Sequence, residues 1–197
     1  MEVKDYVEEI TQTACSFFPS YRPRTFYATV IATIVATGWF SSDISELIGP
    51  TVHKVSGGLA FLANRVVDIG TSLKITKEMD DPRFVEYDLN KYYREKSPLV
   101  VKHPTPREFI TPTMLIGNLI GLAISSTFGP NLGYGMAAGT PQTYLNNRNV
   151  ARQIRLGKNI GDEVKAMIEN DTPDADIRQF LSNLKENKKK TLDTYLI

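Results

Sequence analysis

The feature that most constrains this chain is a run of 39 residues without a single charge, from Phe109 to Asn147. Charged residues make up 23% of the 197 residues, so chance gives such a run with a probability on the order of 10⁻⁵ per starting position. A second uncharged run covers the 18 residues from Thr25 to Ser42. A membrane span needs about 20 mostly apolar residues. The second run is therefore long enough for one span, and the first for one span plus a short or re-entrant one.

Charge is concentrated in the rest of the chain. Three polar segments hold 3, 8 and 10 basic residues, and they cover residues 1–24, 73–108 and 148–197. The intervening residues hold only Asp43, Glu46, Lys54, Arg65 and Asp68. This alternation predicts two membrane hairpins joined by a polar loop.

The apolar segments predict an all-α membrane bundle of about four spans, which cover residues 24–40, 55–73, 109–128 and 131–147. Residues 1–23 carry an amphipathic N-terminal helix, because Val3, Val7, Ile10, Ala14 and Phe17 recur at helical spacing. Within the bundle, residues 74–108 form a polar loop, and residues 148–197 form a polar helical tail. The segment 131–147 is only weakly apolar, so a re-entrant segment or a glycine-rich loop stays open for it.

Small residues at four-residue spacing indicate close helix packing. Gly117 and Gly121 form one such pair, and Gly135 and Gly139 form another. Small residues at this spacing let membrane helices approach closely. We therefore expect these four glycines to lie at helix contacts.

A polar cluster interrupts the second predicted span at Asn64, Arg65, Asp68 and Thr71. Arg65 and Asp68 are three residues apart, so they share a helix face and can form an ion pair. Charges inside a membrane usually face the bundle interior or water. Two interpretations remain: an intramembrane polar pair, or the wet end of a helix from which Arg65 extends to the interface.

The basic residues also predict a topology. The two short connections carry only Lys54, so with four spans all three polar segments fall on one side. The positive-inside rule makes that side cytoplasmic, or the corresponding interior side of an organelle, with both termini on it. The first residues are amphipathic and acidic, which is not the pattern of a signal peptide. The expected partners are the lipid bilayer and other membrane subunits or further copies of the chain, with no nucleic acid.

Catalytic and ligand-binding motifs are not found. The chain has no phosphate-binding loop, nucleophile elbow, zinc-protease motif or cysteine pair. We therefore predict no catalytic residues, no metal and no cofactor. His53 is interpreted as interfacial, His103 as a loop residue, and Cys15 as an inert, partly buried thiol.

One local pattern resembles a known group of proteins. Asp68-Ile69-Gly70-Thr71-Ser72, followed by Glu86-Tyr87-Asp88-Leu89-Asn90, is similar to a family of small, uncharacterised polytopic membrane proteins. Those proteins have an Asp-x-x-Thr-Thr element inside a helix and a later acidic-x-Asn-Pro element. In this chain Lys91 stands where that family has proline. The resemblance implies a small helical bundle with an intramembrane aspartate, and it implies no activity.

Three functions are compatible with the sequence. The first is a non-enzymatic accessory or assembly subunit of a larger membrane complex. The second is a small carrier or channel that uses Arg65 and Asp68 as a polar relay. The third is a soluble or virion structural protein whose Gly/Ala-rich block is a buried core.

Overall fold

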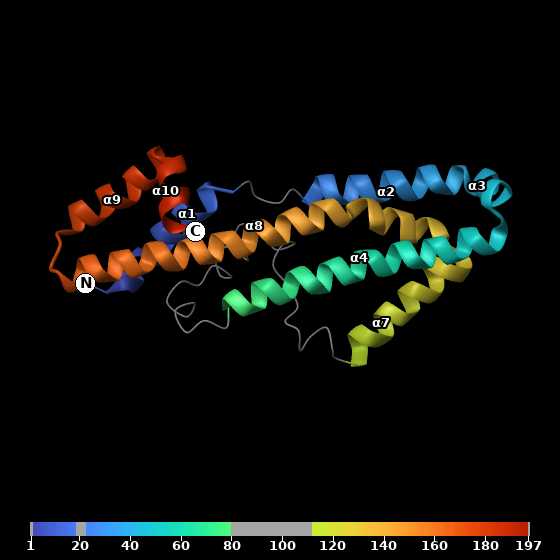
Figure 1. Ribbon diagram of the computed structural model, residues 1–197, viewed down its shortest axis with the longest axis horizontal. Helices are drawn as coiled ribbons and strands as arrows, with labels where there is room; N and C mark the ends of the chain where they lie inside the picture. The colour runs from blue at the N-terminus through green and yellow to red at the C-terminus, as the bar shows by residue number, and fades with distance from the viewer. Residues whose placement is uncertain (1, 19–22, 80–111, 197) are drawn as a thin grey trace. The chain divides into compact units, whose positions relative to one another are not determined.

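A computed structural model describes residues 2–18, 23–79 and 112–196, and every regular element in these residues is helical (Figure 1). The all-α prediction is confirmed for this part of the chain. The elements in order are η1 (Val3–Tyr6), α1 (Val7–Ser16), α2 (Pro23–Trp39), α3 (Ser41–Ile48), α4 (Pro50–Met79), α7 (Pro112–Ala123), η3 (Ile124–Phe128), α8 (Pro130–Glu169), α9 (Asp174–Glu186) and α10 (Lys188–Tyr195). Within the described residues, no helix combines the length and the apolarity that crossing a membrane requires.

The chain divides into two compact units. Of the described residues, unit 1 contains 2–18, 74–79 and 147–196, and unit 2 contains 23–73 and 112–146. The N-terminal helix and the C-terminal tail, which the sequence suggested as separate segments, therefore belong to the same unit.

Unit 1 has an ordinary apolar core. The core consists of nine buried side chains from η1, α1, α8 and α9: Tyr6, Ile10, Ala14, Leu156, Ile160, Val164, Ile177, Leu181 and Leu184. Of the residues whose spacing predicted an amphipathic helix, Ile10 and Ala14 lie in this core and Val3 and Phe17 pack against it, whereas the buried Tyr6 was not among them. In this unit the large apolar side chains are inside, and the charged side chains are outside except for the buried Lys158.

The four long helices of unit 2 all begin with proline, at Pro23, Pro50, Pro112 and Pro130. Proline suits the first position of a helix because its backbone conformation is already helical and its missing N–H has no partner there. A short helix, α3, and Gly49 with φ +86° connect α2 to α4. The predicted segments 24–40 and 109–128 coincide with α2 and with α7 plus η3 to within a few residues. The other two boundaries were wrong: α4 begins five residues before residue 55 and ends six after residue 73, and α8 continues from the predicted segment 131–147 through 22 residues of the predicted tail.

Glycines set the closest helix contacts in unit 2. A Cβ atom placed on Gly133 of α8 would collide with the Gly57 carbonyl oxygen of α4, so only glycine allows these backbones to meet. Seven residues further along both helices, Asn64 donates to Thr140 across 3.0 Å. Since residue numbers increase together, α4 and α8 run parallel. Helix α2 runs antiparallel to α8, because Gly135 packs on Ile34 whereas Gly139 packs on Phe26.

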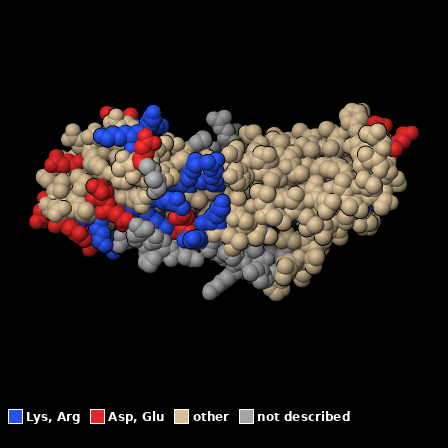
Figure 2. All heavy atoms as spheres, in the orientation of Figure 1, with Lys and Arg blue, Asp and Glu red and all other residues tan. Residues whose placement is uncertain are grey.

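Unit 2 is polar inside and apolar outside. Its buried polar side chains include His53, Asn64, Thr71, Ser72 and Ser125, whereas its buried apolar ones are Val30 and Phe61. All exposed large hydrophobic side chains of the described residues lie between Tyr27 and Leu145, hence in unit 2. The face of unit 2 visible in Figure 2 is uncharged except at the end that carries α3.

Candidate functional site

The densest polar network of unit 2 surrounds His53, whose side chain is 4% exposed. His53 Nδ1 lies 3.0 Å from the Tyr134 hydroxyl, and Nε2 lies 3.1 Å from Ser41 Oγ. The Tyr134 hydroxyl is also 2.5 Å from Ser56 Oγ. These four side chains connect α3, α4 and α8. The sequence interpretation of His53 as interfacial did not include this network, because a single histidine in an apolar segment does not reveal a partner 81 residues away.

The hydroxyl groups of this network share acceptors. Ser56 Oγ donates to the His53 carbonyl oxygen across 2.9 Å, and the Tyr134 hydroxyl donates to the same carbonyl oxygen across 3.3 Å. Each ring nitrogen of His53 faces a hydroxyl, Tyr134 at Nδ1 and Ser41 at Nε2. The arrangement fastens the α3–α4 turn to α8.

The predicted polar cluster forms a second network on α4. Asn64 is 1% exposed and donates to Thr140. The Arg65 guanidinium donates to Asn64 Oδ1 across 2.6 Å, and its Nη1 lies 3.6 Å from Asp68 Oδ2. Thr71 donates its hydroxyl proton to the Val67 carbonyl oxygen, one turn back on the same helix. The structure therefore brings Asn64, Arg65 and Asp68 together, and turns the Thr71 hydroxyl toward the α4 backbone.

The helix contacts also fix the level of this cluster within unit 2. Gly139 of α8 packs on Phe26, in the first turn of α2, and the next residue, Thr140, binds Asn64. Arg65 therefore lies level with the beginning of α2, far from the middle of that helix at Ile31. The ion pair therefore lies near the end of the bundle at which α2 begins.

The four glycines predicted to lie at helix contacts are in different surroundings. A Cβ on Gly121 would come within 2.6 Å of the Phe61 ring, one on Gly135 within 2.5 Å of Ile34, and one on Gly139 within 2.5 Å of Phe26. The prediction was wrong for Gly117, because a Cβ there would meet no described atom within 4 Å. The helix-contact glycines that the pattern missed are Gly57, Gly58 and Gly133, which have no partner glycine four residues away on their own helix.

In unit 1, the buried polar residue with the clearest electrostatic signature is Tyr6. Its hydroxyl donates to Asp174 Oδ1 across 2.8 Å, and its ring is fully buried. Burial, followed by this hydrogen bond, raises the pKa of Tyr6 to about 12. Arg178 lies against the same ring and pairs with both Asp174 and Glu9. These contacts join α1 to α9, and they are structural.

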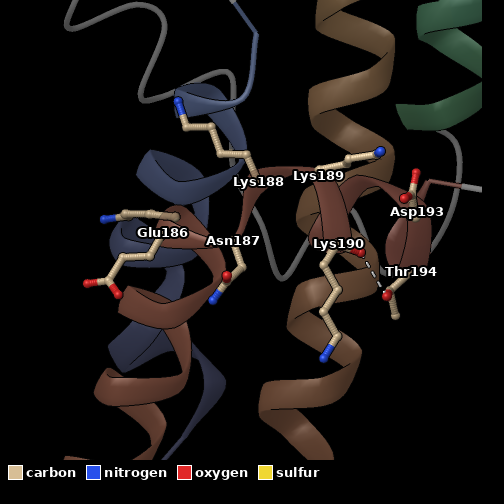
Figure 3. Close-up of a pocket in the computed structure, with 8 residues that line it drawn as sticks. Glu186, Asn187, Lys188, Lys189, Lys190, Asp193 and Thr194 are labelled. Atoms are coloured by element: carbon tan, nitrogen blue, oxygen red, sulfur yellow. Dashed lines mark hydrogen bonds between the residues drawn. The ribbon is translucent and has the colours of Figure 1, made fainter.

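A lysine-rich groove lies where α9 meets α10. Figure 3 shows Lys188, Lys189 and Lys190 pointing in different directions rather than toward one point. Lys188 is also engaged, since its ammonium group lies over the Phe17 ring and 3.3 Å from the Ser16 carbonyl oxygen. The groove therefore provides no converging set of donors for an anion. In residues 2–18, 23–79 and 112–196, no three His, Cys, Asp or Glu side chains gather as metal ligands.

The chain matches no protein-family profile, no curated protein sequence and no solved structure. The second half of the pattern that resembles small polytopic membrane proteins, Glu86 to Asn90, lies outside the described residues.

Proposed function

We propose that unit 2 is the bilayer-embedded part of a non-enzymatic membrane protein, which serves as an accessory or assembly subunit. The observation that carries this proposal is the reversed distribution of side chains in unit 2. Trp39, Leu47 and Phe128 are 80%, 83% and 86% exposed, while His53 and Asn64 are buried. Exposed apolar surface of this extent needs a cover, and lipid favours apolar side chains outside and polar ones inside.

The contrast between the two units supports lipid as the cover. Unit 1 has no exposed large hydrophobic side chain among its described residues, and its core is apolar. The same chain therefore follows the rules of a water-exposed fold in one unit and the opposite rules in the other. The bilayer placement rests on the outer surface of the whole bundle rather than on the apolarity of any one helix.

The dimensions of unit 2 are close to those of a bilayer. Helix α2 has 17 residues, which at 1.5 Å per residue gives about 26 Å. The hydrocarbon core is about 30 Å thick. Trp39 ends α2, Phe40 follows it, and Phe128 ends η3 at the same end of unit 2. Aromatic side chains at one end of a bundle are typical of the membrane–water interface.

The polar interior supports a structural role over transport or catalysis. The hydroxyl, imidazole and amide groups of unit 2 bind one another and fasten α4 to α8. A carrier that uses Arg65 and Asp68 needs them at mid-depth, whereas they lie level with the first turn of α2. By the positive-inside rule, we place the hairpin turns at residues 40–49 and 129 on the far side and the polar segments on the cytoplasmic side.

The first test is an alkaline carbonate wash of membranes that contain the full chain. We expect the protein to stay in the pellet and to be released only by detergent. Release as a monodisperse species overturns the bilayer placement and favours the alternative of a virion-type or other assembly protein, in which further protein copies cover unit 2.

The single tryptophan offers a second, independent test. Reconstituted into vesicles with brominated lipids, Trp39 fluorescence is expected to be strongly quenched. The control replaces Trp39 by Phe and introduces Tyr195→Trp in unit 1, whose fluorescence should be quenched much less. Equal quenching at both positions contradicts the proposal.

A further inference from the structure

We propose that α4 pairs in parallel with the α4 of a second copy of this chain. This inference rests on the proposed bilayer placement and names the partner in assembly. The packed face of α4 contains Gly57, Phe61 and Asn64. The opposite face presents seven exposed apolar side chains, the α4 stripe: Val52, Val55, Leu59, Leu62, Val66, Ile69 and Leu73.

The α4 stripe has the spacing of a helix-pairing seam. Its members follow one another at alternating intervals of three and four residues, and the pattern continues through three heptads. In heptad notation Val52, Leu59, Val66 and Leu73 occupy position a, and Val55, Leu62 and Ile69 occupy position d. The buried Gly57, Asn64 and Thr71 fall at position f, directly opposite the seam.

Each large residue at position d is followed by a small one at position e. The pairs are Val55 and Ser56, Leu62 and Ala63, and Ile69 and Gly70. In a parallel pair, a side chain at d inserts into a hole that the partner's e residue helps to form. Small e residues leave room for these side chains and let the helices approach. Because one surface provides both the large side chains and the holes, it complements a copy of itself about a two-fold axis.

Gly70 supplies an independent reason to expect a partner. Glycine weakens the interior of a helix, and a Cβ at Gly70 would meet no described atom within 4 Å. Residues 23–73 and 112–146 of unit 2 therefore give no reason for glycine at this position. Close approach of a second helix would explain why this position is glycine.

The charged residues of α4 leave the seam clear. The Arg65 guanidinium is turned back onto Asn64 Oδ1 and Asp68, on its own helix. Arg65 occupies position g, which in a parallel pair faces the e position of the following heptad in the partner. That position is Gly70, the smallest residue available, so the bulky guanidinium has space beside the seam.

Helix α7 provides the contrast. Its exposed side chains come in adjacent pairs, Leu115 with Ile116 and Leu119 with Ile120, and they cover a broad arc. A broad apolar arc suits lipid, which requires no particular spacing. The α4 stripe is narrow and is bordered by small residues, which suits another helix.

The test is disulfide cross-linking of the full chain in membranes, with copper–phenanthroline as oxidant. Cys15 is the only cysteine, so a Cys15→Ser background accepts single cysteines. The matched pair is Leu59→Cys and Leu119→Cys, because the two leucines are 60% and 63% exposed. We expect at least a fivefold higher fraction of disulfide-linked dimer for Leu59→Cys, and low values for cysteines at the b positions Ala60 and Val67. Adding Gly70→Leu should reduce cross-linking at Ile69→Cys at least fivefold, with the helix content unchanged.

Equal cross-linking at Leu59 and Leu119, no cross-linking at either, or no effect of Gly70→Leu overturns the pairing. The carbonate wash separates this outcome from a failure of the bilayer placement. A protein that stays in the pellet without stripe-specific cross-links is a membrane protein that does not pair through α4. Stripe-specific cross-links in a protein that carbonate releases support the pairing and overturn the bilayer placement.

Discussion

Adding one methyl group at Gly133 is expected to destabilise unit 2, whereas the same change at Gly117 is expected to stabilise it. At Gly133 the new Cβ would collide with the Gly57 carbonyl oxygen. Both helix backbones would have to move, because no flexible side chain can give way. At Gly117, in the interior of α7, the new Cβ would meet no described atom within 4 Å.

The expected change in the free energy of unfolding is the sum of two opposing contributions, steric overlap and helix propensity. Excess volume in a packed core costs about 1–3 kcal/mol, and a collision between two backbones belongs at the upper end of that range. Replacing glycine by alanine inside a helix contributes about 1 kcal/mol of stability. The net effect is a loss of about 2 kcal/mol for Gly133→Ala and a gain of about 1 kcal/mol for Gly117→Ala.

The assay is thermal unfolding of the detergent-solubilised chain, followed by far-ultraviolet circular dichroism. One kcal/mol shifts the Tm of a domain of this size by about 2–4 °C. We expect Gly133→Ala to lower Tm by about 4–8 °C, and Gly117→Ala to raise it by about 2–4 °C. Shifts in the same direction, or no shift for Gly133→Ala, would refute the assignment of the α4–α8 contact.

Three further predictions concern single polar groups. Because burial raises the pKa of Tyr6 to about 12, the fold favours the neutral phenol. The stability that Tyr6 contributes is thus complete below pH 10 and is lost as pH rises from about 10 to about 12. Tyr6→Phe should flatten that part of the stability curve and remove a late-titrating phenol from the tyrosinate absorbance. Lys158 is 2% exposed and contacts Glu78, so Lys158→Ala should lower the free energy of unfolding by about 3 kcal/mol, measured with denaturant. Arg155 is 52% exposed and pairs with the same carboxylate, so Arg155→Ala should lower it by less than about 1 kcal/mol. Equal losses of stability would contradict the argument from burial. Tyr134→Phe should cost about 1–3 kcal/mol by removing a buried hydroxyl from the His53 network, and an unchanged Tm would show that the network is not stabilising.

The approximate positions of the unit 2 helices could be predicted from the sequence because prolines and uncharged runs mark them, whereas charge did not mark the end of α8, which continues to Glu169. The uncharged runs gave their approximate extent, and Pro23, Pro112 and Pro130 lie at or near the predicted boundaries. Local spacing also placed Arg65 beside Asp68, because residues three apart share a helix face. Whether each glycine packs depends on the neighbouring helix, so the spacing of Gly117 and Gly121 could not tell an open position from a packed one.

The contacts between distant segments could not be predicted. The His53 network requires α8 to lie beside α4 in one particular register, and no pattern local to residue 53 defines that register. Unit 1 presents the same difficulty. The acidic helix near the N-terminus and the tail both appeared as separate amphipathic helices, and their shared core becomes visible only when Tyr6 meets Asp174.

The contact between Tyr6 and Asp174 constrains the order in which the two units can fold during translation. Tyr6 and Asp174 are separated by 168 positions, and a ribosome adds about 5–20 residues per second. The apolar side of α1 must therefore wait roughly 10–30 s for α9 to emerge, while all of unit 2 is being synthesised. During this interval the apolar face of α1 has no packing partner. A chaperone or a membrane surface can then bind that face. Unit 1 can close only after α9 has emerged, so truncation before Asp174 should expose the N-terminal helix to proteolysis and leave the hairpins of unit 2 intact.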